Sequence, residues 1–342
     1  MLRHSSDAEP GFTRQRMGRH WAYFDGDTRV TDRATIDRLN AIGLPPAYGK
    51  AWFCKDANGH LQAIGIDARG RKQYRYHPEY RAKQDGAKFD GLCEFGKALP
   101  KIRRKVETDL RERTLSKDKV LAAVVRLLDE EYLRVGNQEY AKANKSFGAT
   151  TLLSRQVHDD GRKVKMRFKA KSGVEREVAI TGRTLRRLVR QLQELPGQAL
   201  FQYINGDGNP HPVSSSDVND YIREASGGEF TAKHFRTWGA SAIAFEQLLD
   251  HSKATRISVN TMVEPVAEAL GNTVTISRKA YVHPSLIEAV KEQPRNPLNG
   301  MERPPARKRL SSVEVALLDF LAPPQKRRRK SAVRTASTQT AG

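Results

Sequence analysis

The sequence predicts an α+β protein, with a small, mainly β N-terminal domain and a larger, mostly helical domain that carries a three-stranded antiparallel sheet. Three observations support this prediction. Residues 21–80 interleave aromatic residues with turn formers, which is typical of short strands. Helical periodicity dominates after residue 98, and only the interval 149–181 returns to strand character with tight turns. A chain of 342 residues, 38% of them hydrophobic, is long enough for two domains with cores of their own.

In the N-terminal part, we expect a flexible segment over residues 1–20 and a β-rich domain over residues 21–97. A helix is predicted at 31–41, and a hairpin turns at Ala57-Asn58-Gly59 because Asn-Gly is a strong turn signal. Charge and glycine accumulate over residues 81–97. This composition predicts the crossing into the second domain.

The second domain is predicted to span residues 98–298. Ser116 is a candidate N-cap and Gly271 a candidate helix end. Gly161 and Gly173 separate the three predicted strands of a meander. Helices are expected at 101–113, 116–133, 182–195, 214–225, 232–250 and 259–270. Residues 299–342 are predicted to form a basic, mainly flexible tail, in which only 312–321 could form a short helix.

The charge indicates a polyanionic partner. The formal net charge is +21 and the pI is about 10.1; residues 301–342 hold ten Lys and Arg against three Asp and Glu, which leaves +14 for the rest of the chain. Cations built into a folded body suit the phosphates of nucleic acid, although a solubility surface is the alternative. The sequence contains no apolar run of 18 residues, so no membrane helix is predicted. The N-terminus lacks the apolar core of a secretory signal. Two cysteines, Cys54 and Cys93, exclude a disulfide scaffold and show no zinc-ligand spacing.

Four positions gather the residue types that phosphodiester chemistry needs. Arg134 follows an apolar helix, Arg236 lies in the first turn of a long helix, Lys171 lies at a hairpin tip, and Tyr281 precedes a Pro turn. Guanidinium groups are planar and permanently charged, so two of them suit the equatorial oxygens of a phosphoryl transition state. A lysine can protonate an alkoxide leaving group, and a phenol can act as a covalent carrier.

These segments, in this order, resemble the type IB DNA topoisomerases in their small, poxvirus-like bacterial form, which share a core with the tyrosine recombinases. The resemblance covers residues 20–295. It depends on the R-x-G segment that leads to T-T-L, the lysine hairpin, the K-x-x-R-T-W-G helix and the S-R-K-A-Y segment. The stretch DARGRKQYRYH is similar to the cap domain of that family.

The resemblance implies that Tyr281 is the nucleophile of a 3′-phosphotyrosyl intermediate, that Arg134 and Arg236 hold the non-bridging oxygens, and that Lys171 is the general acid. Lys169 and Lys165 remain alternatives to Lys171. It also implies relaxation of supercoiled DNA without ATP, metal or another cofactor, by a monomer clamped around double-stranded DNA in the cytoplasm at the nucleoid. No membrane partner and no nucleotide cofactor are expected.

One position departs from the family. Asn272 stands where many members carry histidine; an amide can donate a hydrogen bond to a phosphate oxygen but cannot carry charge. We expect Asn272 to position the phosphate, with His283 as a less favoured substitute. Further residues match DNA contacts of the family or flank Arg236, although the two tyrosines could instead pack in the β core. They are Arg71, Gln73, Tyr74, Tyr76, Lys233 and His234.

Two other functions compete. A site-specific tyrosine recombinase shares the chemistry, but such enzymes usually have histidine at the positions of Lys233 and Asn272. A non-catalytic DNA-coating protein would use the basic charge alone, and the ordered Arg, Lys, Arg and Tyr set argues against it.

Overall fold

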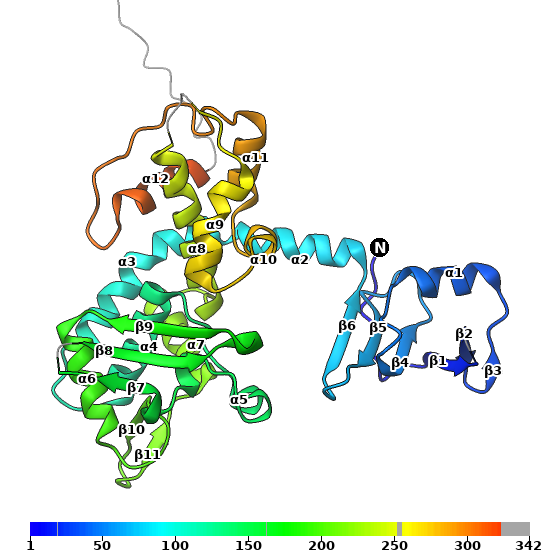
Figure 1. Ribbon diagram of the computed structural model, residues 1–342, viewed down its shortest axis with the longest axis horizontal. Coiled ribbons are helices and arrows are strands. Elements are labelled where there is room, and N and C mark those ends of the chain that lie inside the picture. The colour runs from blue at the N-terminus through cyan, green and yellow to red at the C-terminus, as the bar shows by residue number, and fades with distance from the viewer. Residues whose placement is uncertain (19, 162, 252–254, 323–342) are drawn as a thin grey trace, which may run out of the picture. The chain divides into compact units, whose positions relative to one another are not determined.

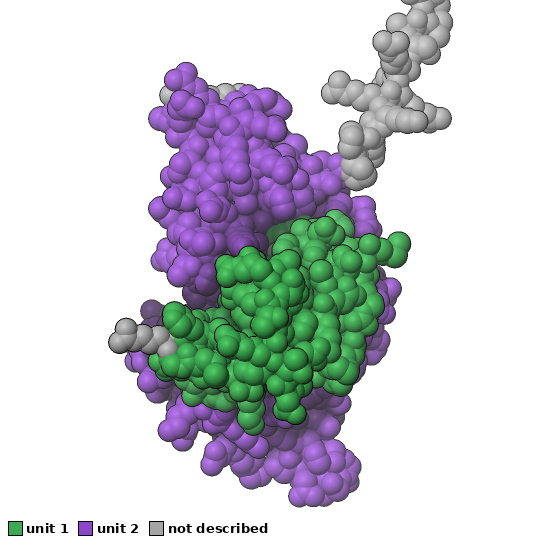
Figure 2. All heavy atoms as spheres, turned by 90° about the vertical axis from the view of Figure 1, so that its right-hand side faces the viewer, with its two compact units in different colours: residues 1–90 green, residues 91–342 purple. Residues whose placement is uncertain are grey.

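The computed structural model describes residues 1–18, 20–161, 163–251 and 255–322. The chain divides into two compact units, Met1–Asp90 and Gly91–Gly342, which are coloured separately in Figure 2 and described separately below. The predicted boundary after residue 97 differs from this division. In the described part of the chain, no helix is long and apolar enough to cross a bilayer.

The first unit is built on a six-stranded antiparallel sheet in the order β3-β2-β1-β4-β5-β6 (Figure 1). The strands are β1 (Gly11–Met17), β2 (His20–Asp25), β3 (Thr28–Arg29), β4 (Gly49–Cys54), β5 (Leu61–Ile66) and β6 (Lys72–Tyr76). The predicted hairpin over residues 57–59 joins β4 to β5 and is confirmed. This sheet is larger than the three-stranded sheet that the sequence indicated for the helical domain.

The expectation that residues 1–20 are flexible is wrong. Strand β1 pairs with β2 on one side and with β4 on the other, so it lies inside the sheet. Upstream of it, Arg3 bridges to Gly59, and the Ser5 hydroxyl bonds the carbonyl of Leu61 at 3.1 Å. Most side chains of β1 are exposed, which explains why its sequence is polar and carries no apolar period.

One helix covers the core of this unit. Helix α1 (Arg33–Ala41) begins where the Asp32 carboxylate accepts the Thr35 N–H, as an N-cap does. Its Leu39 packs with Phe53 and Ala63 of the sheet in a buried cluster. The helix predicted at 31–41 is therefore confirmed.

The segment predicted as a domain crossing is helical. Helices α2 (Pro78–Asp90) and α3 (Leu92–Asp109) follow each other almost without interruption. Of the glycines that suggested a linker, Gly96 has a packing role: a Cβ on it would lie 2.3 Å from the ring of Trp238. Glycine therefore lets α3 approach that indole closely.

The second unit is mainly helical. Its helices are α3, α4 (Lys117–Glu131), α5 (Gln138–Asn144), α6 (Arg183–Gln193), α7 (Ser215–Ser226), α8 (Ala232–Leu249), α9 (Val259–Leu270), α10 (Val274–Ala280), α11 (Pro284–Glu292) and α12 (Ser312–Leu321). Its strands are β7 (Val157–Asp159), β8 (Val164–Lys169) and β9 (Glu175–Ile180), with a small hairpin of β10 (Gln202–Ile204) and β11 (Pro210–Pro212).

The meander β7-β8-β9 is confirmed, but its first strand is shorter than predicted. Residues 149–151 and 154–156 form 3₁₀ turns instead of strand. The reason is that this segment bonds to the chain after α4, for example through Thr150 N–H to the carbonyl of Val135 at 2.7 Å. Those bonds replace a sheet ladder.

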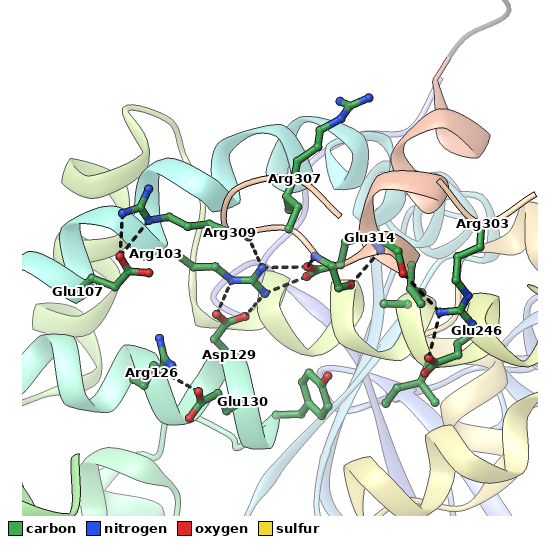
Figure 3. A pocket seen from close by; sticks show the side chains of 17 residues that line it. Arg103, Glu107, Arg126, Asp129, Glu130, Glu246, Arg303, Arg307, Arg309 and Glu314 are labelled. Carbon is green, nitrogen blue, oxygen red and sulfur yellow. Dashed lines mark hydrogen bonds and ion pairs between the residues drawn. The ribbon is translucent and has the colours of Figure 1, made fainter. Parts of the chain in front are cut away.

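The expectation of a mainly flexible tail is also wrong for residues up to 321. The short helix α12 exists, and it buries Val313, Val315 and Leu317 against the second unit. Figure 3 shows Arg103 of α3 lying between the carboxylates of Asp129 and Glu314, beside a pocket of about 780 Å³. The basic run at 326–330 lies outside the described residues.

Candidate active site

Arg134 is positioned by the backbone that follows α4. Helix α4 ends at Tyr132, which adopts a left-handed conformation with φ of 51°. The chain then runs beside residues 148–150: the Arg134 carbonyl accepts the Ala149 N–H at 2.8 Å. A Cβ on Gly148 would lie 2.5 Å from that carbonyl oxygen, so this approach requires glycine. The R-x-G and G-x-T-T segments therefore belong to one backbone unit.

Arg236 is a buried cation, with 4% of its surface exposed. Its guanidinium donates to the carbonyls of Tyr132 and Leu270, at the C-terminal ends of α4 and α9. Helix C-termini carry partial negative charge, which favours a cation there. Burial, together with the charge of nearby Arg134, still lowers the pKa of Arg236 to about 10. The group is therefore a cation at neutral pH whose charge is poorly compensated.

Asn272 lies directly after the left-handed Gly271 that ends α9. Its Oδ1 accepts a hydrogen bond from Arg134 Nη2 at 3.0 Å. Because a guanidinium has only donors, this contact fixes which amide atom is the oxygen. Among the residues that the structure describes, the remaining Nδ2 of Asn272 is buried without a hydrogen-bond partner, and so is Nε of Arg236. Unsatisfied buried donors beside cations are what an anion site presents before it is occupied.

Tyr281 lies beside Arg236. It follows α10, and the Arg236 guanidinium lies 4.9 Å from the centre of its ring. Ser241 of α8 anchors the segment, because its hydroxyl bonds the Tyr281 carbonyl at 3.4 Å and accepts the His283 N–H at 3.1 Å. His283 Nδ1 accepts the Ser285 N–H and caps α11. His283 therefore has a structural role as the N-cap of α11.

Lys171 lies at the tip of the β8–β9 hairpin and is exposed. Its neighbour Ala170 lines a small cavity together with Arg134 and Arg236, which places the hairpin at the rim of the site. Of the two alternatives, Lys165 forms an ion pair with Glu177 at 2.5 Å.

Sequence reasoning missed Arg176. This residue of β9 lines the same cavity as Arg134 and Arg236. Burial, with a further contribution from Arg134, lowers its pKa, and Glu131 opposes the shift. No local motif marks Arg176, because it is one of several basic residues on the meander. Three guanidinium groups around one cavity make a site for an anion such as a phosphate.

The candidate DNA contacts of the first unit lie on and beside β6. Arg71 and Gln73 both bond the carboxylate of Asp67 and, with Arg71 contributing most, lower the pKa of Asp67 to about 2. Tyr74 and Tyr76 are 47% and 44% exposed, and their rings stack 6.1 Å apart. The alternative that both tyrosines pack in the core is therefore wrong.

The two candidate DNA contacts shortly before Arg236, Lys233 and His234, differ in exposure. Lys233 is exposed. His234 is half-buried: its Nδ1 accepts the Thr231 N–H, its ring stacks on Phe95 at 5.5 Å, and burial lowers its pKa. The structure thus places His234 in the packing at the start of α8.

Comparisons with known proteins identify the family to which this chain is similar. Residues 77–301 match the model of the eukaryotic DNA topoisomerase I catalytic core, and residues 20–67 match that of the bacterial DNA topoisomerase IB N-terminal domain. A DNA topoisomerase 1B of Acanthamoeba polyphaga mimivirus is 31% identical over 298 residues, which cover 83% of this chain and 88% of the viral protein. The DNA topoisomerase 1B of Vaccinia virus (strain Copenhagen) is 20% identical over 279 residues, or 77% and 84% of the two chains.

Among solved structures, the XerH site-specific recombinase bound to a palindromic difH substrate aligns with a TM-score of 0.36 and 17% identity, over 56% of this chain and 50% of that one. This similarity is too low to indicate the fold or the function. The family matches and the mimivirus relative do identify the family. The chain therefore belongs to the poxvirus-like type IB DNA topoisomerases.

Proposed function

We propose that this enzyme relaxes supercoiled DNA by cutting and resealing one strand through a covalent link between Tyr281 and a 3′ phosphate. The observation that supports this most strongly is the site in which Arg134 and Arg236 line one small cavity, while Arg134 bonds Asn272 and the Arg236 guanidinium lies beside the ring of Tyr281. Its unsatisfied donors suit phosphate oxygens.

In the cleavage step, the Tyr281 oxygen forms a bond to phosphorus as the bond from phosphorus to the 5′ oxygen breaks. The phenol loses its proton to water, and the 5′ oxygen receives a proton from Lys171. The guanidinium groups of Arg134 and Arg236 stabilise the charge on the non-bridging oxygens, and Asn272 Nδ2 donates to one of them. The reverse sequence reseals the strand.

We further propose that the reaction needs neither ATP nor a metal ion. One phosphodiester replaces another of similar energy, so no external energy source is required. The charge that a divalent ion would supply comes from permanently charged guanidinium groups. We also propose that the enzyme acts as a monomer on double-stranded DNA, with the basic first unit contributing contacts.

The test is relaxation of a supercoiled plasmid in the presence of a chelator and without nucleotide, followed by denaturing capture of protein-linked DNA. We expect relaxed closed circles and a captured adduct. A plasmid left supercoiled under these conditions would contradict the proposal.

Tyr281→Phe supplies the residue-specific arm of this test. The variant lacks the attacking oxygen but keeps the ring beside Arg236, so it should bind DNA normally and form no adduct. Tyr203→Phe, a tyrosine on β10 whose ring faces His211, is the matched control and should behave as the wild type does. An adduct on Tyr281→Phe would assign the nucleophile to another residue.

A further inference from the structure

Two arginines join the same two helix ends at consecutive carbonyls. Arg176 Nη2 donates to the carbonyls of Glu131 and Ala269, at 3.3 Å and 3.0 Å. Arg236 donates to the next carbonyl on each side, those of Tyr132 and Leu270. Each guanidinium therefore spans from the end of α4 to the end of α9.

A third contact continues this series. Arg134, just beyond the end of α4, donates to Asn272, just beyond the end of α9. The pairs 131 with 269, 132 with 270 and 134 with 272 keep the same offset in sequence. The segments 131–134 and 269–272 thus run beside each other in one register. Arg176 makes the first contact of this series, at the helix ends, and the Arg134–Asn272 contact is the last.

The chemistry of the helix ends explains why cations bridge them. The last carbonyls of a helix have no partner within it and carry partial negative charge. Two such ends brought together repel each other unless donors lie between them. Arg176 also packs against the left-handed turn, because a Cβ on Gly271 would lie 3.5 Å from its Nη1.

We propose that Arg176 is a positioning residue that sets the register between the end of α4 and the end of α9, and thereby aligns Arg134 and Asn272 on the scissile phosphate. Its Nη2 already bonds two main-chain carbonyls, so Arg176 acts through the residues that follow them. This role rests on the proposed function, because it concerns how the phosphate site is held.

The test measures the first-order rate of adduct formation on supercoiled plasmid at saturating enzyme, beside the DNA affinity and the melting temperature. Arg176→Gln should lower the rate by about 10²-fold, because a displacement of about 1 Å in a catalytic group costs that much. The affinity should change by less than about threefold, because one half-buried group adds little to binding by many phosphate contacts. Arg176→Lys keeps a charge and donors, and should recover about tenfold of the lost rate.

The matched control is Arg167→Gln. Arg167 is an exposed arginine on the neighbouring strand β8 that pairs with Glu177, and its loss should leave the rate unchanged. A second comparison uses Asn272→Ala as background. If Arg176 acts through the Arg134–Asn272 pair, adding Arg176→Gln to Asn272→Ala should lower the rate by less than about threefold more, since coupled residues are non-additive.

The outcomes are separable. Wild-type protein that forms no adduct would refute the proposed function itself. A normal wild-type adduct together with an undiminished rate for Arg176→Gln would refute only the register role. The register role would also be refuted if the rate effects of Arg176→Gln and Asn272→Ala multiply in full, or if Arg176→Lys recovers none of the lost rate. It would be refuted as well if rate, affinity and melting temperature fall together, as for a general loss of structure.

Discussion

At the scale of single residues, the candidate active site holds its cations with main-chain carbonyls. Arg236 and Arg176 donate to the ends of two helices, and Arg134 donates to an amide oxygen. In the described part of the chain, none of these three guanidinium groups forms an ion pair with a carboxylate. Carbonyls orient a guanidinium without neutralising it. The full positive charge of Arg134 and Arg236 therefore stays available to a phosphate.

Asn272 gives a sharp test of this arrangement. Asn272→Asp keeps the oxygen that accepts from Arg134 but replaces the buried Nδ2 donor with a negatively charged acceptor. Loss of a donor to a transition-state oxygen costs about 10²–10³-fold in rate, and the added charge repels the phosphate. We expect Asn272→Asp to form adduct more slowly than Asn272→Ala, with the rate of adduct capture as the measurement.

Both variants lack the Nδ2 donor, so the comparison isolates the effect of a negative charge at its position. Asn272→Ala removes both amide atoms and adds no charge, so it reports the loss of the hydrogen bonds alone. Equal rates for the two variants would mean that Nδ2 does not face the phosphate. In that case Asn272 would serve only to hold Arg134.

At the scale of elements, α12 is an integral part of the second unit. Glu314 bonds both Arg103 of α3, at 2.8 Å, and the indole of Trp238 on α8, at 2.9 Å. Trp238 lies two residues beyond Arg236 on that helix. Residues 302–321 lie beyond the matched catalytic-core model and yet complete the packing around the helix that carries Arg236.

Glu314 predicts a pH-dependent contribution to stability. Burial alone would raise the pKa of this carboxyl, but hydrogen bonds and charge from Arg103, with help from Trp238, lower it below its ordinary value. Its contribution is therefore complete above about pH 4.5 and is lost as pH falls through the folded pKa. We expect Glu314→Gln to lower the unfolding free energy by about 3 kcal/mol at pH 7, because it leaves Arg103 with a weaker buried partner.

Urea unfolding between pH 3.5 and pH 7 measures this effect. The difference in unfolding free energy between the wild type and Glu314→Gln should stay constant down to about pH 5 and shrink below pH 4.5. Glu302→Gln, at an exposed position, is the control and should match the wild type throughout. A difference that does not change with pH would exclude titration of Glu314 as the cause.

Two truncations separate α12 from the basic residues beyond it. A chain ending at residue 322 keeps α12 and should retain cleavage, while the salt dependence of its DNA binding weakens by about 0.9 in slope for each DNA phosphate that the removed residues would have neutralised. A chain ending at residue 301 exposes the apolar surface that α12 covers, and should lose stability and cleavage together. Thermal melting and adduct capture on both chains test this, and full activity after truncation at 301 would contradict the role given to α12.

At the scale of the whole molecule, we propose that each unit contributes a different property to DNA binding and cleavage. The second unit holds the candidate active site, whereas the first presents exposed aromatic rings on β6. A net charge of +21 supports binding to the DNA backbone without regard to sequence. We therefore expect affinity and cleavage rate to respond to changes in different units.

Tyr74 and Tyr76 test this division. Replacing both with serine should weaken DNA binding about tenfold, which corresponds to about 1.4 kcal/mol, and leave the cleavage rate at saturating enzyme unchanged. Trp21→Ser on β2 removes another exposed aromatic ring of the same unit and should have no effect on affinity. A reduced rate at saturation would show that the first unit takes part in the chemical step.

Elements that depend on local signals could be predicted from the amino-acid order alone. The helix predicted at 31–41, the N-cap Ser116, the turn at Asn58-Gly59 and the helix end at Gly271 all lie where local chemistry indicates. The same order indicated Arg134, Arg236, Asn272 and Tyr281, which the structure brings together. These residues could be predicted because they belong to motifs that occur in a fixed order along the sequence.

Features that depend on distant partners became visible only in the folded chain. Polar β1 becomes a strand because β2 and β4 pair with both its edges, and Gly96 serves in α3 because the Trp238 ring packs closely against it. Arg176 joins the site because two helix ends, 138 residues apart in sequence, meet at its side chain. Hydrogen bonds of this kind leave no recognisable pattern in the local sequence, because the donor and the acceptor lie far apart along the chain.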